Sequence, residues 1–335
     1  MSGPASKIEI VAPLSQAMEL TKRILFRPFN LEKWLVIGFA AFLAHLGGGG
    51  RFNFNFPSTW RNHSWRAHTW TSDFSNQVPG WFWPLMFVLV PLAIALAVLF
   101  AWIGSRGRFI FTDCIARGRG AIVAPWHEYR KEGNSLFIFT LGVALAFLIL
   151  ATIGFVPLVL PHILHHHGFT LTFSLGLVSW LVLLIIAALA WWIISQFMVP
   201  AMYRQRCNAW SAFQKTVALI TGHAAEIILF VLFLVVISIA LAIIVFLVGI
   251  FTCCIGLCLF ALPYIGTVIL LPVEILLFGY TLLFLRQFGG DWDVWATLEA
   301  APARVIVEIP SPPAPRPDTS PSSPPSSTEP PPPQM

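Results

Sequence analysis

Charged side chains are scarce in this sequence. Asp, Glu, Lys and Arg make up 10% of its 335 residues, whereas hydrophobic residues make up 57%. Soluble domains carry roughly 25% charged residues, so this composition excludes an ordinary soluble protein. The apolar residues gather in runs of about 20, the length that crosses the hydrocarbon layer of a bilayer. Because these runs are continuous rather than alternating, they predict membrane-spanning helices and not a β-barrel.

Common catalytic motifs are also missing. The sequence holds no G-x-S-x-G nucleophile elbow, no G-x-x-x-x-G-K-[ST] phosphate loop and no H-E-x-x-H zinc helix. A short apolar core with a cleavage site is absent from the N-terminal region, so the first span is expected to act as the targeting signal. We therefore expect a protein that is not an enzyme and that needs no cofactor.

Six apolar runs predict an all-α membrane helix bundle. Residues 1–30 are expected to form a cytoplasmic N-terminal segment, residues 31–293 the membrane domain, and residues 294–335 a disordered cytoplasmic tail rich in Pro and Ser. The expected spans are Leu31–Gly49, Trp81–Gly104, Leu136–Leu164, Leu171–Met198, Ile227–Phe251 and Tyr264–Leu285.

Amphipathic stretches precede the first, third and fifth spans. They lie in Ala17–Leu35, Arg119–Ile138 and Ala212–Leu229. Apolar residues three and four positions apart are typical of helices that lie on a membrane surface. The sequence thus predicts three units, each of a cytoplasmic interfacial helix followed by two spans.

Lys and Arg are distributed unevenly between the two sides of this predicted bundle. Of the 20 such residues, all but Arg51, Arg61 and Arg66 fall on the side that holds both termini. Because basic connections stay in the cytoplasm, both termini are predicted to be cytoplasmic. The net charge of +5 then indicates attraction to anionic lipid head groups rather than to nucleic acid.

Glu274 is the charged residue of the apolar stretch Thr267–Phe284. A charge at mid-bilayer costs at least about 2.5 kcal/mol, so such a group is a candidate for proton or cation binding. The sequence suggests few polar neighbours, because Ser195 and Gln196 are expected near the cytoplasmic end of the fourth span and His45 near the outer end of the first. We therefore expect a neutral or hydrogen-bonded packing group, with a transport site as the alternative.

Three arginines flank Asp113 in the stretch "GRFIFTDCIARGRG", and a fourth, Arg106, immediately precedes it. One interpretation is that they hold the phosphate of a lipid head group. The other is that they only set the orientation in the membrane, with Asp113 paired to one of them. The candidates for lipid or partner contact are Arg106, Arg108, Arg117 and Arg119.

The predicted outer side is rich in side chains that bind zinc or copper. Cys253, Cys254 and Cys258 lie in the connection before the last span, where a Cys253–Cys258 disulfide can form on an oxidising side. Free cysteines of apolar spans are usually packing residues, and no C-x-x-C…C-x-x-C framework is present, so metal binding is the less favoured interpretation. Its candidate ligands are His162, His165, His166 and His167.

Three stretches carry a family resemblance: "RGRFIFTDCIARGRGAIVAPWHEYRKEGNSLFIF", "FMVPAMYRQRCNAWSAF" and "LPYIGTVILLPVEILLFGYTLLFLRQFG". Their arginine–glycine pairs, Pro125–Trp126, Pro200 with Tyr203, and Phe288–Gly289 resemble an uncharacterised bacterial family of polytopic membrane proteins. They are also similar to the membrane domain attached to glycerophosphodiester phosphodiesterases. The resemblance implies a six-helix inner-membrane protein of unknown function and transfers no catalytic residue.

Two functions are open on this basis. The first is a non-enzymatic scaffold or accessory protein that contacts lipids through its basic face, and a protein partner through the Pro-rich tail. The second is a transporter or channel for a small solute or ion, which uses the bundle interior around Glu274. A water-filled cavity at Glu274 would favour transport, and a dry, packed surround would favour the scaffold.

Overall fold

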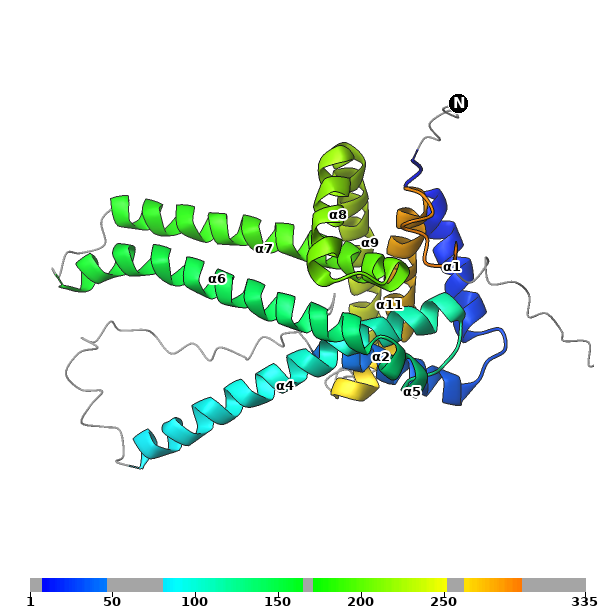
Figure 1. Ribbon diagram of the computed structural model, residues 1–335, viewed down its shortest axis with the longest axis horizontal. Coiled ribbons are helices and arrows are strands. Elements are labelled where there is room, and N and C mark those ends of the chain that lie inside the picture. Colours follow the sequence, from blue (N-terminus) through cyan, green and yellow to red (C-terminus); the bar gives the residue numbers. More distant parts are fainter. Residues whose placement is uncertain (1–7, 47–80, 165–170, 252–261, 297–335) are drawn as a thin grey trace, which may run out of the picture.

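The computed structural model describes residues 8–46, 81–164, 171–251 and 262–296. Within these ranges the regular elements are helices, so the all-α prediction is confirmed there (Figure 1). They are α1 (Ala12–Leu25), α2 (Leu31–Leu46), α4 (Phe82–Arg117), α5 (Val123–Glu128), α6 (Arg130–Leu164), α7 (Leu171–Gln205), α8 (Ala209–Gly222), α9 (Ala224–Phe251) and α11 (Pro263–Arg286).

Five described helices are long and apolar enough to cross a membrane: α4, α6, α7, α9 and α11. The chain is therefore a multi-pass membrane protein by its helix composition. The sixth span, predicted at Leu31–Gly49, is not confirmed, because α2 has 16 residues and a span needs about 20. Short helices do precede α2, α6 and α9, as the three-unit pattern predicts, and they are α1, α5 and α8.

Helix α4 is longer than its predicted span. The sequence analysis ended this span at Gly104, but the helix continues to Arg117 and stops at Gly118, which has a φ of 61°. Glycine adopts this left-handed conformation without strain and is the usual residue at such a helix end. The extension is largely buried, so most of the basic stretch expected in a connection belongs instead to a packed helix.

Helix α2 packs antiparallel to this buried end of α4. A Cβ added to Gly107 would lie 2.5 Å from the carbonyl carbon of Leu43, and one added to Gly120 would lie 3.4 Å from the Cα of Lys33. The absence of side chains at both glycines therefore allows the two backbones to approach closely. As a result, α2 lies beside the polar end of α4 and not beside its apolar end.

A second contact of α2 depends on a proline in α11. Pro272 lies inside that helix and has no N–H to donate to the carbonyl of Val268, four residues earlier. The indole N–H of Trp34 donates a hydrogen bond to this carbonyl at 3.0 Å. The α11 carbonyl that lacks its usual helical hydrogen bond thus accepts a hydrogen bond from α2 instead, and this bond attaches α2 to α11.

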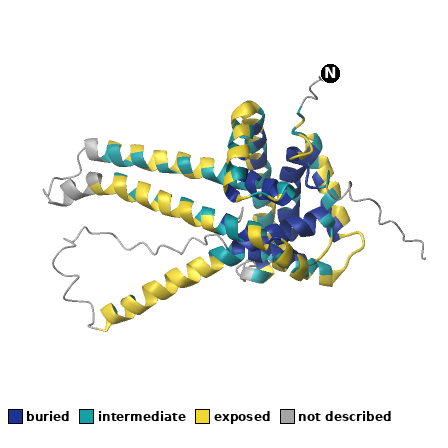
Figure 2. Cartoon of the chain, viewed as in Figure 1, coloured by how far each residue is buried: buried dark blue, intermediate teal, exposed yellow. Residues whose placement is uncertain are grey.

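The buried residues gather at one end of the long helices (Figure 2). This core includes α1, α2, most of α11 and the adjoining ends of α4, α6, α7 and α9, and it extends to the buried Val294. Beyond it, α4, α6 and α7 project to the same side in Figure 1. We call residues 82–100, 138–156 and 175–189 of these helices the apolar arms.

Candidate functional site

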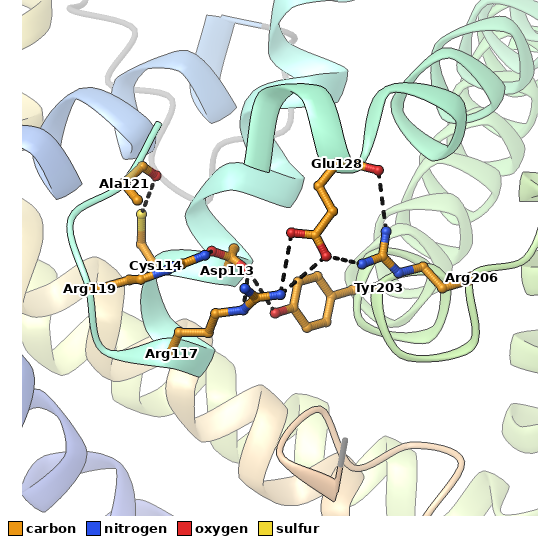
Figure 3. A network of polar contacts seen from close by, with 8 residues as sticks. All are labelled: Asp113, Cys114, Arg117, Arg119, Ala121, Glu128, Tyr203 and Arg206. Carbon is orange, nitrogen blue, oxygen red and sulfur yellow. Dashed lines mark hydrogen bonds and ion pairs between the residues drawn. The ribbon is translucent and has the colours of Figure 1, made fainter. Parts of the chain in front are cut away.

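A buried carboxylate connects α4 with α7. Asp113 has an exposed fraction of 0%, and its Oδ1 lies 2.9 Å from Nε of Arg117, one helical turn later. Its Oδ2 lies 3.4 Å from Arg119, and the Tyr203 hydroxyl of α7 donates a hydrogen bond to Oδ1 at 3.0 Å (Figure 3). The burial cost of this charge is offset because it has two cationic partners and a hydrogen-bond donor. We call these residues the Asp113 cluster.

The cluster continues through Glu128 to the segment after α7. Arg117 contacts the Glu128 carboxylate at 3.2 Å, and Arg206 binds the same carboxylate from the other side (Figure 3). The guanidinium of Arg206 also lies 3.9 Å from the ring centre of Tyr129, a favourable cation–π position. This arrangement ties the connection between α5 and α6 to the end of α7.

Tyr129 forms the middle of an aromatic stack. Its ring centre lies 5.8 Å from that of Phe109 and 4.8 Å from that of Tyr203, in stacked geometry. Burial raises the pKa of the Tyr129 hydroxyl, while Tyr203 and Arg206 act in the opposite direction. A tyrosine hydroxyl is already neutral at physiological pH, because its ordinary pKa is about 10, and a raised pKa does not change this. The stack therefore adds no charge to the cluster.

Arg106 has partners of a different kind. Its Nη2 donates a hydrogen bond to Oδ1 of Asn134 at 2.8 Å. The guanidinium carbon lies 4.3 Å from the ring centre of Trp102 and 5.0 Å from that of Trp126. Its exposed fraction is 6%. Arg106 therefore joins α4, α5 and α6 inside the core.

The structure separates the four arginines that were predicted to contact lipid or a partner. Arg106 and Arg117 bind groups within the chain, and Arg108 lines a small cavity. Arg119 pairs with Asp113, yet 43% of its side chain is exposed. Lipid or partner contact by these residues stays a prediction, and Arg119 is the best placed of them to make it.

Glu274 faces a cavity of about 60 Å³ at the meeting point of α2, α4, α7 and α11. Its Oε1 lies 3.5 Å from Nε2 of His45, and the side chain is 7% exposed. The residues that line the cavity are Ala44, His45, Arg108, Phe111, Ser195, Gln196, Val199, Glu274 and Phe278.

The expectation that Glu274 has few polar neighbours is wrong. The sequence analysis placed His45 near the outer end of a full span and Arg108 in a connection outside the helices. In the structure α4 continues through Arg108, and the short α2 runs antiparallel beside it. His45 and Arg108 therefore lie at one level, where Ser195 and Gln196 of α7 complete the wall.

Several residues of the Asp113 cluster were not identified as candidates from the sequence. Glu128 and Tyr129 are neighbours at the end of α5 and Arg206 follows α7, so no recognisable spacing relates them. Tyr203 was noted only as part of the Pro200–Tyr203 resemblance. A partial signal was available in Pro125–Trp126 and Pro200–Tyr203, which lie close to these residues in the sequence.

The predicted metal ligands cannot be placed in this structure. His165, His166, His167 and the cysteines 253, 254 and 258 lie outside the described residues, as does the segment 297–335, and His162 is described only as part of the α6 backbone. Among the residues that are described, no group of three or more His, Cys, Asp or Glu could hold a metal ion. Cys114 and Cys207 are free thiols.

Comparison with known proteins identifies a family but no function. No curated protein and no solved structure matches the chain. Nothing in the comparison links it to glycerophosphodiester phosphodiesterases, so that part of the expected resemblance is not supported. The family model that matches is described as a family of unknown function, DUF7544, and it covers residues 8–295. The chain belongs to this family.

Proposed function

We propose that the chain is a non-enzymatic membrane scaffold whose apolar arms bind lipids or the spans of partner proteins. One observation carries this proposal. In the most apolar 18-residue segments of α4, α6 and α7, the buried shares are 0%, 6% and 0%. Spans that surround a transport path pack against one another and turn polar groups toward it. These three helices instead leave most of their apolar side chains exposed, although Gly154 of α6 lies against the Trp180 ring of α7.

The packed core would hold the arms in place. The Asp113 cluster connects α4 to α7, and Arg106 connects α4 to α6. A rigid base with projecting apolar helices suits a protein that organises its surroundings. We further propose that the core faces the cytoplasm of a bacterial inner membrane, because Lys and Arg concentrate there, and that exposed cations such as Arg119 contact anionic lipids. The Pro-rich tail would bind a protein partner.

Four consecutive residues of α4 test the proposal, because successive residues of a helix point in different directions. Phe87, Val88, Leu89 and Val90 have exposed fractions of 83%, 65%, 45% and 51%. A photoreactive amino acid is placed at each position in turn, in the full chain in native membranes. At all four we expect crosslinks to lipid or to another polypeptide, identified by mass spectrometry. Ile110 of the same helix, with an exposed fraction of 0%, is the matched control and is expected to crosslink within the chain.

The transporter hypothesis makes a different prediction for this experiment. It is favoured by one observation, the polar cavity that reaches Glu274. A span of a closed transport bundle has one face inside, so at least one of the four positions would crosslink to α6 or α7 of the same chain. Such a crosslink would overturn the scaffold proposal and favour transport.

A further inference from the structure

Arg108 is unusual among the arginines of the core. Its Nε atom is buried and has no hydrogen-bond partner, and among the described residues its guanidinium has no ion-pair partner. By contrast, Arg106 binds Asn134, while Arg117 and Arg119 bind Asp113. A guanidinium is always charged, and a buried N–H of such a group that lacks an acceptor is unfavourable.

The acid in the same cavity is already engaged. Glu274 pairs with His45 at 3.5 Å and makes no ion pair with Arg108. When His45 carries a proton, the pair consists of an imidazolium and a carboxylate and is neutral overall. The lining then carries one excess positive charge, that of Arg108, since the residues from α7 that face the cavity, Ser195, Gln196 and Val199, carry none.

The size of the cavity restricts what can balance that charge. One water molecule needs about 10–15 Å³ of such space, so about 60 Å³ holds a few waters or one small anion with part of its hydration. A lipid head group or an organic solute of more than a few heavy atoms is too large. Chloride and formate have the right charge and size, and a guanidinium is a suitable donor to either.

We propose that the cavity between α2, α4, α7 and α11 binds a small monovalent anion, and that binding is coupled to a proton on the His45–Glu274 pair. Arg108 is the direct ligand of the anion. When the pair loses its proton, it becomes a net negative charge that faces the anion and repels it. Linkage then requires that the affinity for the anion rises as the pH falls and that anion binding takes up a proton. The site does not depend on what the arms bind.

Chloride binding to the purified full chain in lipid nanodiscs tests the site. We expect saturable binding of radiolabelled chloride and a higher thermal unfolding midpoint in chloride than in gluconate at equal ionic strength, because gluconate is too large for the cavity. Within the pH range in which the pair titrates, the affinity should fall with rising pH by up to about tenfold per pH unit. If chloride and gluconate give the same midpoint at every pH and no chloride binds, the cavity holds water only and the proposal fails.

Substitutions assign the roles of the individual residues. Arg108→Gln is expected to weaken chloride binding by about tenfold or more, the usual loss for a hydrogen bond to a charged group. Arg23→Gln removes the same charge from an exposed position of α1 and should leave binding unchanged. The double substitution of His45→Gln with Glu274→Gln removes the titrating pair, and it is expected to retain chloride binding but to lose most of its pH dependence, a result that misfolding cannot mimic. Chloride binding by Arg108→Gln equal to that of the unaltered chain, or an unchanged pH dependence in the double variant, would overturn the assignment.

Discussion

Replacing Asp113 by asparagine is expected to lower the free energy of unfolding by about 2–3 kcal/mol. Removal of one partner from a fully buried ion pair costs about 3–5 kcal/mol, since the other charge is left buried and unpaired. Here the side chains of Arg117 and Arg119 keep exposed fractions of 27% and 43%, so water relieves part of the cost. Asparagine preserves the shape of the side chain, and the effect therefore reports on charge rather than on packing.

Denaturation in lipid–detergent micelles measures this effect. Asp291 is exposed, and its side chain makes no ion pair in the described part of the chain, so Asp291→Asn is the matched control and should change stability by less than about 0.5 kcal/mol. Equal effects of the two substitutions would mean that the Asp113 cluster does not hold α4 against α7.

Alanine at Gly107 is expected to destabilise the chain by about 3 kcal/mol. The added Cβ would lie 2.5 Å from the carbonyl carbon of Leu43 and 2.6 Å from the amide nitrogen of Ala44. Both are backbone atoms, which cannot rotate away as the end of a long side chain can. Forcing an extra carbon into a packed interface typically costs about 1–3 kcal/mol, and a backbone clash places this site at the upper end. We expect α2 to move away from α4.

Gly142 provides the control with the opposite sign. It lies in α6, and a Cβ added there meets no atom within 4 Å. Alanine favours a helix over glycine by about 1 kcal/mol, so Gly142→Ala should stabilise the chain slightly, whereas Gly107→Ala should destabilise it in the same assay. A stabilising Gly107→Ala would show that α2 does not pack against this part of α4.

Asp113 and Gly107 are both related to the cavity at Glu274, because of their positions on α4. Gly107 and Asp113 flank Arg108 on α4, and Tyr203, which binds Asp113, follows Ser195 and Gln196 on α7. The contacts that fix α4 against α2 and α7 thus also set the distance between the walls of the cavity. A loss of packing at either site is therefore a loss of the geometry around Glu274.

The long helices could be predicted from composition alone. Burial in lipid requires only a sufficiently long apolar run, and α4, α6, α7, α9 and α11 each contain one. The helix ends were harder to predict. An apolar run does not show where contact with lipid ends and contact with other helices begins. Thus α4 continues past Gly104 to Arg117, since its polar end is buried against α2 and other core elements.

The candidate site could be predicted only in part. Glu274 was identified because it interrupts an apolar run, and Asp113 because arginines surround it. Their partners depend on contacts between residues far apart in the sequence. The 3.5 Å contact of His45 with Glu274 requires that α2 lie beside the extended end of α4, and the hydrogen bond from Tyr203 to Asp113 joins residues 90 positions apart. Neither follows from spacing along the chain.

The central claim is that the arms lie in lipid and extend from a packed core. Collision rates of spin labels with oxygen, which concentrates in lipid, and with a water-soluble nickel chelate test it directly. Labels replace Phe87, Leu148 and Leu181 on the arms, which are 83%, 60% and 55% exposed, and Val123 before α6, which is 73% exposed. We predict high oxygen and low nickel contact at the three arm positions, with the reverse at Val123. Nickel contact at the arms as high as at Val123 would contradict the account.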